Sequence, residues 1–309
     1  MIRGAARRAL TALMSPGLAR MRRRQHDLVA LVGQLHAARV RALPDRSPLA
    51  AAEFKAFSQW GEDGILQYLV DKVPLSTRWF VEFGVEDYFE ANTRFLLVND
   101  NWAGMVLDGS ESNIAAIRRD ELSWRHQLDA RHCFVTRDNI DGLIRSAAPD
   151  EDIGLLSVDI DGNDYWVWQA IRSVRPRIVV VEYNSVFGPE LEVTIPYLED
   201  FQRLQAHHST LYWGASLAAL CRLAAAKGYD FVGSNSAGNN AFFVRSDLSQ
   251  RLRKLSPAEG YVESRFRESK SPSGELTFAG GIDRIRLIAH LPVVDVSSDR
   301  TAPLGELLK

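Results

Sequence analysis

Two aspartates stand at the end of one apolar segment, in the order Ser157-Val158-Asp159-Ile160-Asp161. Side chains alternate between the two faces of an extended chain, so Asp159 and Asp161 share a face. Burying two carboxylates this close together is costly unless they are paired, hydrogen-bonded or bound to a metal ion. Carboxylate oxygens are ligands that suit Mg²⁺ or Ca²⁺. The alternative interpretation is a helix cap followed by a hydrogen-bonded turn.

A second polar pair, Glu182 and Asn184, follows the next apolar segment along the chain. In a parallel sheet with these two strands adjacent, both side chains would converge with the aspartates. The sequence therefore predicts one of two arrangements. One is a cation site with Asp159, Asp161 and Asn184 as tentative ligands, and the other is a polar cleft for a hydroxyl-rich substrate.

His207 and His208 are adjacent in a polar segment downstream. Either is a candidate general base, because an imidazole titrates near neutral pH. The simpler alternative is a pair of surface histidines without a role in chemistry.

An earlier apolar segment ends in Gly84, and the next one ends in Asp108. A glycine at a strand end lets a ligand approach the backbone closely. An acid about 20 residues past the first turn is where nucleoside-binding α/β folds hold ribose hydroxyls. No GxGxxG motif is present, which disfavours a standard dinucleotide site. Asp108 could equally cap the next helix, and Asp138 and Asn139 could either meet an adenine edge or cap a helix.

Alternating strand-like and helix-like segments position these residues. We predict strands at 79–85, 103–108, 132–136, 153–160, 177–183, 230–233 and 241–244. Helices are expected near 50–72, 90–98, 112–119, from about 139, 164–172 and 215–227. This alternation indicates βαβ units and a mostly parallel sheet. The last two strands are joined too closely for a crossover helix, so they are expected to be antiparallel. The predicted fold is a Rossmann-like α/β domain: a seven-stranded, mostly parallel sheet with helices on both faces, plus an N-terminal helical extension.

The chain has 309 residues, of which 46% are hydrophobic and 25% charged, as in a globular protein. Its two cysteines, Cys133 and Cys221, form no zinc motif and fit a reducing compartment, so a cytoplasmic location is expected. Residues 1–46 contain ten arginines and two acids, a net charge of +8, against −2 for the whole chain. The remainder is therefore acidic, which argues against nucleic acid as the main ligand.

The basic segment is rich in helix-forming residues, and Pro16-Gly17 divides it into two predicted helices. In the second, an apolar stripe falls at i, i+3, i+4 and i+7, formed by Leu28, Leu31, Val32 and Leu35. Residues 1–41 could pack on the body or on a partner subunit, lie on the inner face of a membrane as a peripheral helix, or act as a targeting segment. We divide the chain into a basic helical extension (1–46), a Rossmann-like domain (47–254) and a C-terminal cap or tail packed on the core (255–309).

The segments FVEFGVEDYFEANTRFLL, VLDGS, LLSVDIDGNDYWVW and VVVEYN resemble class I S-adenosylmethionine-dependent methyltransferases. The similarity extends over about residues 57–245 and is greatest to the FkbM-like group, which is associated with O-methylation of polysaccharides and natural products. By this resemblance, Glu82 and Gly84 border the methionine part of S-adenosylmethionine. Asp108 would hold the ribose, Asp138 or Asn139 would contact the adenine, and Asp159 and Asp161 would lie beside the transferred methyl group.

The aspartate pair is also similar to the metal sites of magnesium-dependent sugar O-methyltransferases. The resemblance thus implies an S-adenosylmethionine-dependent O-methyltransferase for a hydroxyl of a glycan or glycosylated metabolite, with Mg²⁺ as a second cofactor. Asp161 is then a candidate catalytic residue, together with His207 or His208, which are candidates from their residue type. One departure is Glu86-Asp87-Tyr88, which occupies the usually small, glycine-rich turn. Two alternatives stay open. They are a catalytically silent Rossmann-like module in a surface-polysaccharide modification complex, and a metal-dependent nucleotide-sugar transferase.

Overall fold

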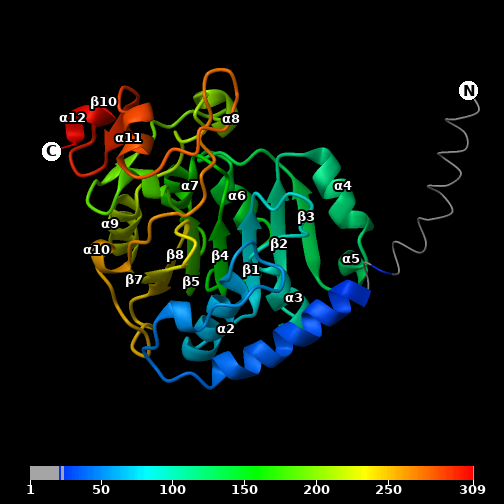
Figure 1. Ribbon diagram of the computed structural model, residues 1–309. Coiled ribbons are helices and arrows are strands. Elements are labelled where there is room, and N and C mark those ends of the chain that lie inside the picture. The colour runs from blue at the N-terminus through cyan, green and yellow to red at the C-terminus, as the bar shows by residue number, and fades with distance from the viewer. Residues whose placement is uncertain (1–20, 22–23, 309) are drawn as a thin grey trace, which may run out of the picture.

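The computed structural model describes residue 21 and residues 24–308. Its centre is a seven-stranded sheet in the order β3-β2-β1-β4-β5-β8-β7 (Figure 1). The strands are β1 (Trp79–Phe83), β2 (Ala103–Asp108), β3 (Leu128–His132), β4 (Leu155–Val158), β5 (Ile178–Glu182), β7 (Tyr229–Ser234) and β8 (Asn240–Arg245). Strands β1 to β5 are parallel, whereas β8 is antiparallel to both of its neighbours. The predicted Rossmann-like fold class is confirmed.

Helices cover both faces of this sheet because its central strands are apolar on both sides. Phe80 and Val180 point to the face covered by α2 (Glu62–Lys72), α3 (Arg94–Asp100) and α4 (Glu111–Arg119). Val81 and Val181 point to the opposite face, which is covered by α6 (Ile140–Arg145), α7 (Asp164–Ala170) and α9 (Leu217–Lys227). The short helix α5 (Leu122–Arg125) follows α4, and the 3₁₀ turn η1 (Leu49–Ala51) precedes α2.

A helix over residues 24–41 crosses the first of these faces. Its packed side consists of small residues: Gly33, Ala37 and Val40 are buried. A Cβ atom at Gly33 would lie 2.6 Å from the ring of Phe95. Only glycine therefore allows the helix to approach Phe95 this closely. The predicted apolar stripe faces outward instead, since Leu28 and Leu35 are 62% and 75% exposed. The predicted first helix and the dividing Pro16-Gly17 lie outside the described residues.

The C-terminal region shares a second sheet with a segment that follows β5. This sheet has the order β10-β9-β6, from β6 (Val193–Thr194), β9 (Pro292–Asp295) and β10 (Arg300–Pro303). It is accompanied by η2 (Ser185–Phe187), α8 (Arg203–Ala206), α11 (Ile282–Ile288) and α12 (Leu304–Leu307), whereas α10 (Pro257–Gly260) packs on α9 and β7 of the main domain. A separate apolar cluster joins residues 285–307 to the segment 186–213, so these two segments form one small layer.

Three predicted elements differ from the observed ones. The strand expected at 132–136 is β3 at Leu128–His132. It is an edge strand in which polar residues interrupt the apolar ones. The helix expected at 50–72 is confined to α2, because the Asp63 carboxylate accepts the backbone N–H groups of residues 56–58 and holds them in a loop. The helix expected at 90–98 begins at Arg94. In the described part of the chain, no helix is long and apolar enough to cross a bilayer.

Candidate functional site

A cavity of about 220 Å³ opens at the carboxyl ends of β1, β2, β3 and β4. This is where parallel α/β sheets bind ligands. Four of the lining side chains are carboxylates, and the lining includes no basic residue among those described. The cavity is lined by Gly84, Glu86, Leu107, Asp108, Gly109, Cys133, Phe134, Val135, Asp159, Ile160, Asp161, Asn163 and Phe201.

Asp108 ends β2 and lines this cavity, where the sequence predicted a ribose-binding acid. One carboxylate oxygen accepts the backbone N–H of Ser110 at 2.8 Å, and the other accepts the N–H of Glu86 at 2.8 Å. Glu86 adopts a left-handed backbone conformation with φ +48°, an uncommon one for this residue type. The two bonds fix Asp108 and hold the loop after β1 against the loop after β2.

Gly84 lies at the end of β1 with φ +69°. A Cβ atom here would lie 1.8 Å from the carbonyl oxygen of Asp159, so a side chain would push the ends of β1 and β4 apart. Glycine is therefore required first by the approach of two protein backbones, and this approach closes the floor of the cavity. The sequence predicted a different reason for glycine at this position, namely the close approach of a ligand.

Glu82 is buried in β1 and is not among the residues that line the cavity. Its carboxylate accepts the backbone N–H groups of Asn92 and Thr93 and the hydroxyl of Thr93. Burial raises the pKa of Glu82, while these hydrogen bonds act in the opposite direction. Glu82 thus fixes the loop that leads to α3, and its interactions are with the protein itself.

The two adenine candidates lie away from the cavity. Asp138 is exposed and borders a different surface depression, beside Arg172. Asn139 accepts the N–H of Thr136 and donates to the carbonyl oxygen of Phe134, so its amide caps a turn. Cys133, Phe134 and Val135 line the cavity after β3, and Phe134 is the exposed one of the three, at 48%. Phe134 was not among the predicted site residues, because the strand was expected to extend over 132–136.

Acidic side chains converge at the ends of β4 and β5, as predicted. Burial raises the pKa of Asp159 well above its ordinary value, and the negative charges of Asp161 and Asp164 raise it further. Burial and the charge of Asp159 likewise raise the pKa of Glu182. Glu182 Oε2 is buried without a hydrogen-bond partner. The two carboxyls therefore hold a proton more readily than ordinary carboxyls do.

Asp161 occupies the boundary between this cavity and a neighbouring one of about 500 Å³. Its carboxylate accepts a hydrogen bond from Arg203 Nη1 at 2.7 Å. Arg203 also pairs with Glu268 and packs over the ring of Trp213, 4.4 Å from its centroid. The second cavity is lined by Phe134, Ile160, Asp161, Phe201, Gln202, Arg203, Leu204, Thr210, Glu268, Lys270 and Leu276.

The tentative metal site is not supported by the arrangement of its residues. The Asn184 amide nitrogen donates to the carbonyl oxygens of Leu211 and Trp213, and its oxygen accepts the N–H of Val186. Asp161 is already paired with a guanidinium group. No group of three or more His, Cys, Asp or Glu side chains in the described chain is arranged to hold a metal ion. These residues therefore do not fit Mg²⁺, and no step is assigned to it.

The two histidines are not brought to the site either. The rings of His207 and His208 lie at a centroid distance of 4.0 Å, tilted by 45°, and the ring of His290 lies 5.5 Å from that of His207. Neither of the adjacent histidines lines one of the two cavities. Burial and the neighbouring imidazoles lower the pKa of His207, so this group is neutral at pH 7 without facing a substrate cavity.

No protein-family model matches the sequence, and no curated protein matches it. Three solved structures to which the chain is similar each have a TM-score of 0.38. One is the O-methyltransferase from Bacillus cereus in complex with SAH, at 15% identity over 71% of this chain and 88% of that one. Another is the N-terminal domain of EvdMO1 in the presence of SAH and D-fucose, at 11% identity over 61% and 81%. The third is the DszA carbon methyltransferase, at 12% identity over 61% and 53%. At these identities and scores, the strand order of the chain itself establishes its fold.

Proposed function

We propose that this chain is an S-adenosylmethionine-dependent O-methyltransferase that acts on a hydroxyl group of a glycan or glycosylated small molecule. The observation that carries the proposal is the charge of the cavity at the carboxyl ends of the strands. Four carboxylates line it, with no basic side chain among the described lining residues. Such a lining attracts a cationic sulfonium and ammonium, and repels the pyrophosphate of a nucleotide sugar.

The cofactor would lie along the ends of β1 and β2. Asp108 is held by two backbone N–H groups and lines the cavity, so its carboxylate is fixed for hydroxyl groups of the ribose. Phe134, next to Gly109, offers a half-exposed ring against which the adenine would stack. Glu86 adds negative charge where the ammonium group of the methionine part would bind. These residues fit the cofactor, and its contribution would be an electrophilic methyl group.

Residues of the chain would position the acceptor and receive its proton. Asp161 borders both cavities, so it is the side chain best placed to bind an acceptor hydroxyl beside the cofactor. As the acceptor oxygen forms its bond to the methyl group, its proton would pass to a carboxylate. Asp161 is the candidate to receive it, because its carboxylate lies on the boundary of both cavities, whereas burial raises the pKa of Asp159 well above its ordinary value and so favours the protonated form, which cannot accept a proton.

The second cavity supports a hydroxyl-rich acceptor. Polar side chains that can exchange hydrogen bonds with hydroxyl groups, among them Gln202, Thr210 and Lys270, alternate with the apolar Phe201 and Leu276. A pyranose ring presents hydroxyl groups at its edges and C–H groups on its faces, and it matches such a lining.

The first experiment is thermal unfolding of the full chain with and without S-adenosylhomocysteine. A ligand at about 100 times its Kd stabilises the folded state by about 2.7 kcal/mol, which raises the Tm by roughly 5 °C for a protein of this size. We expect Asp108→Asn to lose this increase. Asp141→Asn is the matched control, because Asp141 also accepts two backbone N–H groups but lies outside the cavity. No increase with millimolar ligand would refute the cofactor and favour the catalytically silent module.

We also propose that the outward face of the helix at 24–41 binds an anionic membrane surface. Met21, Leu28, Leu31, Val32 and Leu35 are each more than half exposed on this face. Residues 1–46 carry a net charge of +8, which complements anionic lipid and opposes the approach of the same segment in a second copy.

A further inference from the structure

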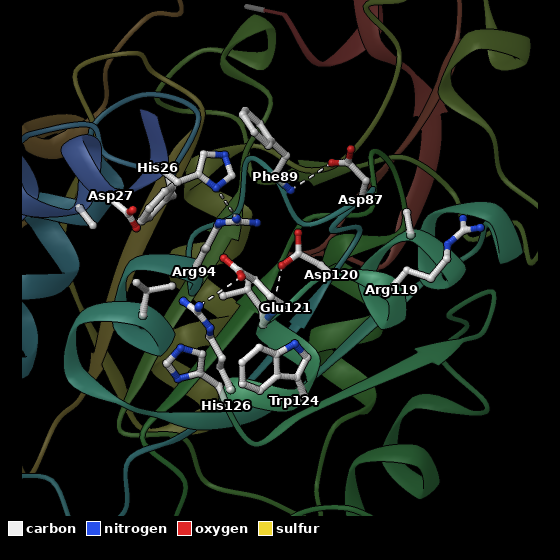
Figure 2. Close-up of a pocket in the computed structure, with 16 residues that line it drawn as sticks. His26, Asp27, Asp87, Phe89, Arg94, Arg119, Asp120, Glu121, Trp124 and His126 are labelled. Carbon is white, nitrogen blue, oxygen red and sulfur yellow. Dashed lines mark hydrogen bonds and ion pairs between the residues drawn. The ribbon is translucent and has the colours of Figure 1, made fainter. Parts of the chain in front are cut away.

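A separate cavity of about 740 Å³ lies between the helix at 24–41 and the body of the domain (Figure 2). Its walls come from that helix, the loop after β1, α3, and the α4–α5 region that leads to β3. It shares no lining residue with the cavity at the carboxyl ends of the strands. It is lined by His26, Asp27, Ala30, Phe57, Asp87, Phe89, Arg94, Val98, Ala116, Arg119, Asp120, Glu121, Leu122, Trp124, Arg125 and His126.

The unusual group in this cavity is the guanidinium of Arg94, which is only 4% exposed. Nη1 donates to the carbonyl oxygen of Tyr88 at 2.5 Å, and Nη2 contacts His26 Nδ1 at 3.4 Å. Nε is buried without a hydrogen-bond partner, and so is His26 Nε2. Arg94 forms no ion pair with an acid of the described chain. Burying a charge without an ionic partner is unfavourable, and Nε of Arg94, beside Nη2, lacks an acceptor that a bound molecule could supply.

That edge is chemically selective. Two parallel N–H donors in one plane match the two oxygens of a carboxylate or phosphate. Four acids also line the cavity: Asp27, Asp87, Asp120 and Glu121. Arg119 and Arg125 line it as well, so the acids exceed the arginines by one, and this balance favours a carboxylate with a single charge over a dianionic phosphate.

The acids also call for a cationic group on the same ligand. Asp120 and Asp87 exert the strongest attraction on Arg94 among the carboxylates, yet neither lies within ion-pair distance of it. Each uses one carboxylate oxygen to accept a backbone N–H, from Leu122 and Phe89 respectively. A ligand ammonium placed between Arg94 and these acids would bind next to the carboxylate.

Two exposed aromatic rings also line the cavity. Phe89 and Trp124 are 52% and 73% exposed, and Figure 2 shows them on opposite sides of Asp120 and Glu121, with Phe89 on the side of Arg94. The Phe57 ring covers one side of the guanidinium, 5.1 Å from it. An apolar side chain on the ligand would gain by covering Trp124, the more exposed of the two rings.

We propose that this cavity is a binding site for a small amino carboxylic acid with an apolar side chain. The carboxylate binds the Nε–Nη2 edge of Arg94, the ammonium binds Asp120 and Asp87, and the side chain covers Trp124. The site is independent of the proposed cofactor site, because the two cavities have separate linings.

Isothermal titration calorimetry of the full chain tests this site with four probes: L-phenylalanine, 3-phenylpropanoate, 2-phenylethylamine and inorganic phosphate. We expect L-phenylalanine to bind at least tenfold more tightly than 3-phenylpropanoate, which lacks the ammonium group, and than 2-phenylethylamine, which lacks the carboxylate. Arg94→Gln is expected to abolish binding. Because Arg94 is buried and that variant could misfold, the exposed-site variants Asp120→Asn and Trp124→Ala are measured as well, each with an expected loss of at least fivefold.

Asp283→Asn is the matched control, since Asp283 is an exposed acid of α11 that lies outside this cavity. It should bind L-phenylalanine as the unaltered chain does. The stabilisation by S-adenosylhomocysteine should persist in Asp120→Asn and Trp124→Ala, which separates this site from the proposed function. The inference is overturned if L-phenylalanine does not bind at 10 mM, if phosphate binds more tightly, or if Asp120→Asn and Trp124→Ala leave binding unchanged.

Discussion

Arg203 donates a hydrogen bond from Nη1 to Asp161 at 2.7 Å, and this ion pair stands on the boundary between the two cavities at the carboxyl edge of the sheet. The contact joins the loop after β4 to α8, which lies at the top of the molecule in Figure 1. It orients the Asp161 carboxylate at this boundary, while burial raises the pKa of Asp159, two residues earlier, well above its ordinary value. The two neighbouring carboxylates thus have different surroundings, and this difference is the basis of the roles proposed for them.

Replacing Asp161 should separate turnover from cofactor binding. We expect Asp161→Asn to lower methyl transfer by about 10²- to 10⁴-fold, the range typical of a lost acid–base or positioning group. The increase in Tm with S-adenosylhomocysteine should remain, because Asp108 and Phe134 are untouched. Rates come from transfer of a labelled methyl group to a panel of glycosides.

Glu263→Gln provides the control for Asp161→Asn. Glu263 is a similarly exposed acid that pairs with the buried Arg284, outside both cavities. Its replacement should leave turnover within about twofold of the unaltered chain. Joint loss of turnover and cofactor binding in Asp161→Asn would contradict the role given to Asp161.

Phe134 is predicted to stack on the adenine. Removing one stacking ring costs about 1–3 kcal/mol when a base lies on it, so Phe134→Ala should weaken binding of S-adenosylhomocysteine by about tenfold or more. Equilibrium titration measures the Kd. Phe278→Ala removes an exposed ring (62% exposed) from outside both cavities and should have no effect. Equal Kd values for the two variants would place the adenine elsewhere.

Much of the fold could be predicted from sequence because its signals are local. The bounds of β2 were predicted fully and those of β5 to within a residue, since both are continuous apolar runs. Asp108 and the meeting of Asp159 with Glu182 followed from strand order. The outer edge strand β3 was misplaced because Asp129 and Arg131 give it a polar pattern, and this error also hid Phe134.

Other features depend on contacts between distant segments, which a sequence pattern does not contain. The helix at 24–41 turns its apolar stripe outward and packs through the buried Gly33 and Ala37, and Gly33 lies directly against Phe95. The side-chain amide of Asn184 donates to the backbone carbonyl oxygens of residues 211 and 213, which lie far along the chain. His207 and His208 were predicted as general bases from their residue type, but their position depends on packing with the small C-terminal layer.

Two buried acids should make stability depend on pH in an unusual direction. Burial raises the pKa of Asp63 and of Asp164 to about 6. Their folded pKa values exceed the unfolded ones, so their contribution to stability is full below about pH 4 and is lost as the pH rises through 6. Each group accounts for about 3 kcal/mol of this change. Urea unfolding between pH 4 and 7 should show stability falling with pH, and falling less in Asp63→Asn.

Asp152→Asn is the control for that measurement, because the pKa of Asp152 is lowered where that of Asp63 is raised. Hydrogen bonding and charge from Arg177 lower the pKa of Asp152, so its contribution is lost only as the pH falls below about 4. This variant should keep the slope of the unaltered chain between pH 4 and 6. If Asp63→Asn gives the same slope as Asp152→Asn, the carboxyl of Asp63 is not the titrating group.

The exposed stripe of the helix at 24–41 predicts binding to anionic vesicles. Apolar side chains would enter the interface while nearby arginines meet the lipid headgroups, so binding should fall with added salt. We expect the full chain to sediment with vesicles that contain phosphatidylglycerol and not with pure phosphatidylcholine.

The double variant Leu31→Glu/Leu35→Glu should weaken this binding at least tenfold. Ile282→Glu, at an exposed apolar residue of α11, should leave it unchanged. Vesicle binding that survives the double variant would assign the interaction to another surface, and concentration-dependent dimerisation lost in the double variant would make this face a subunit contact instead.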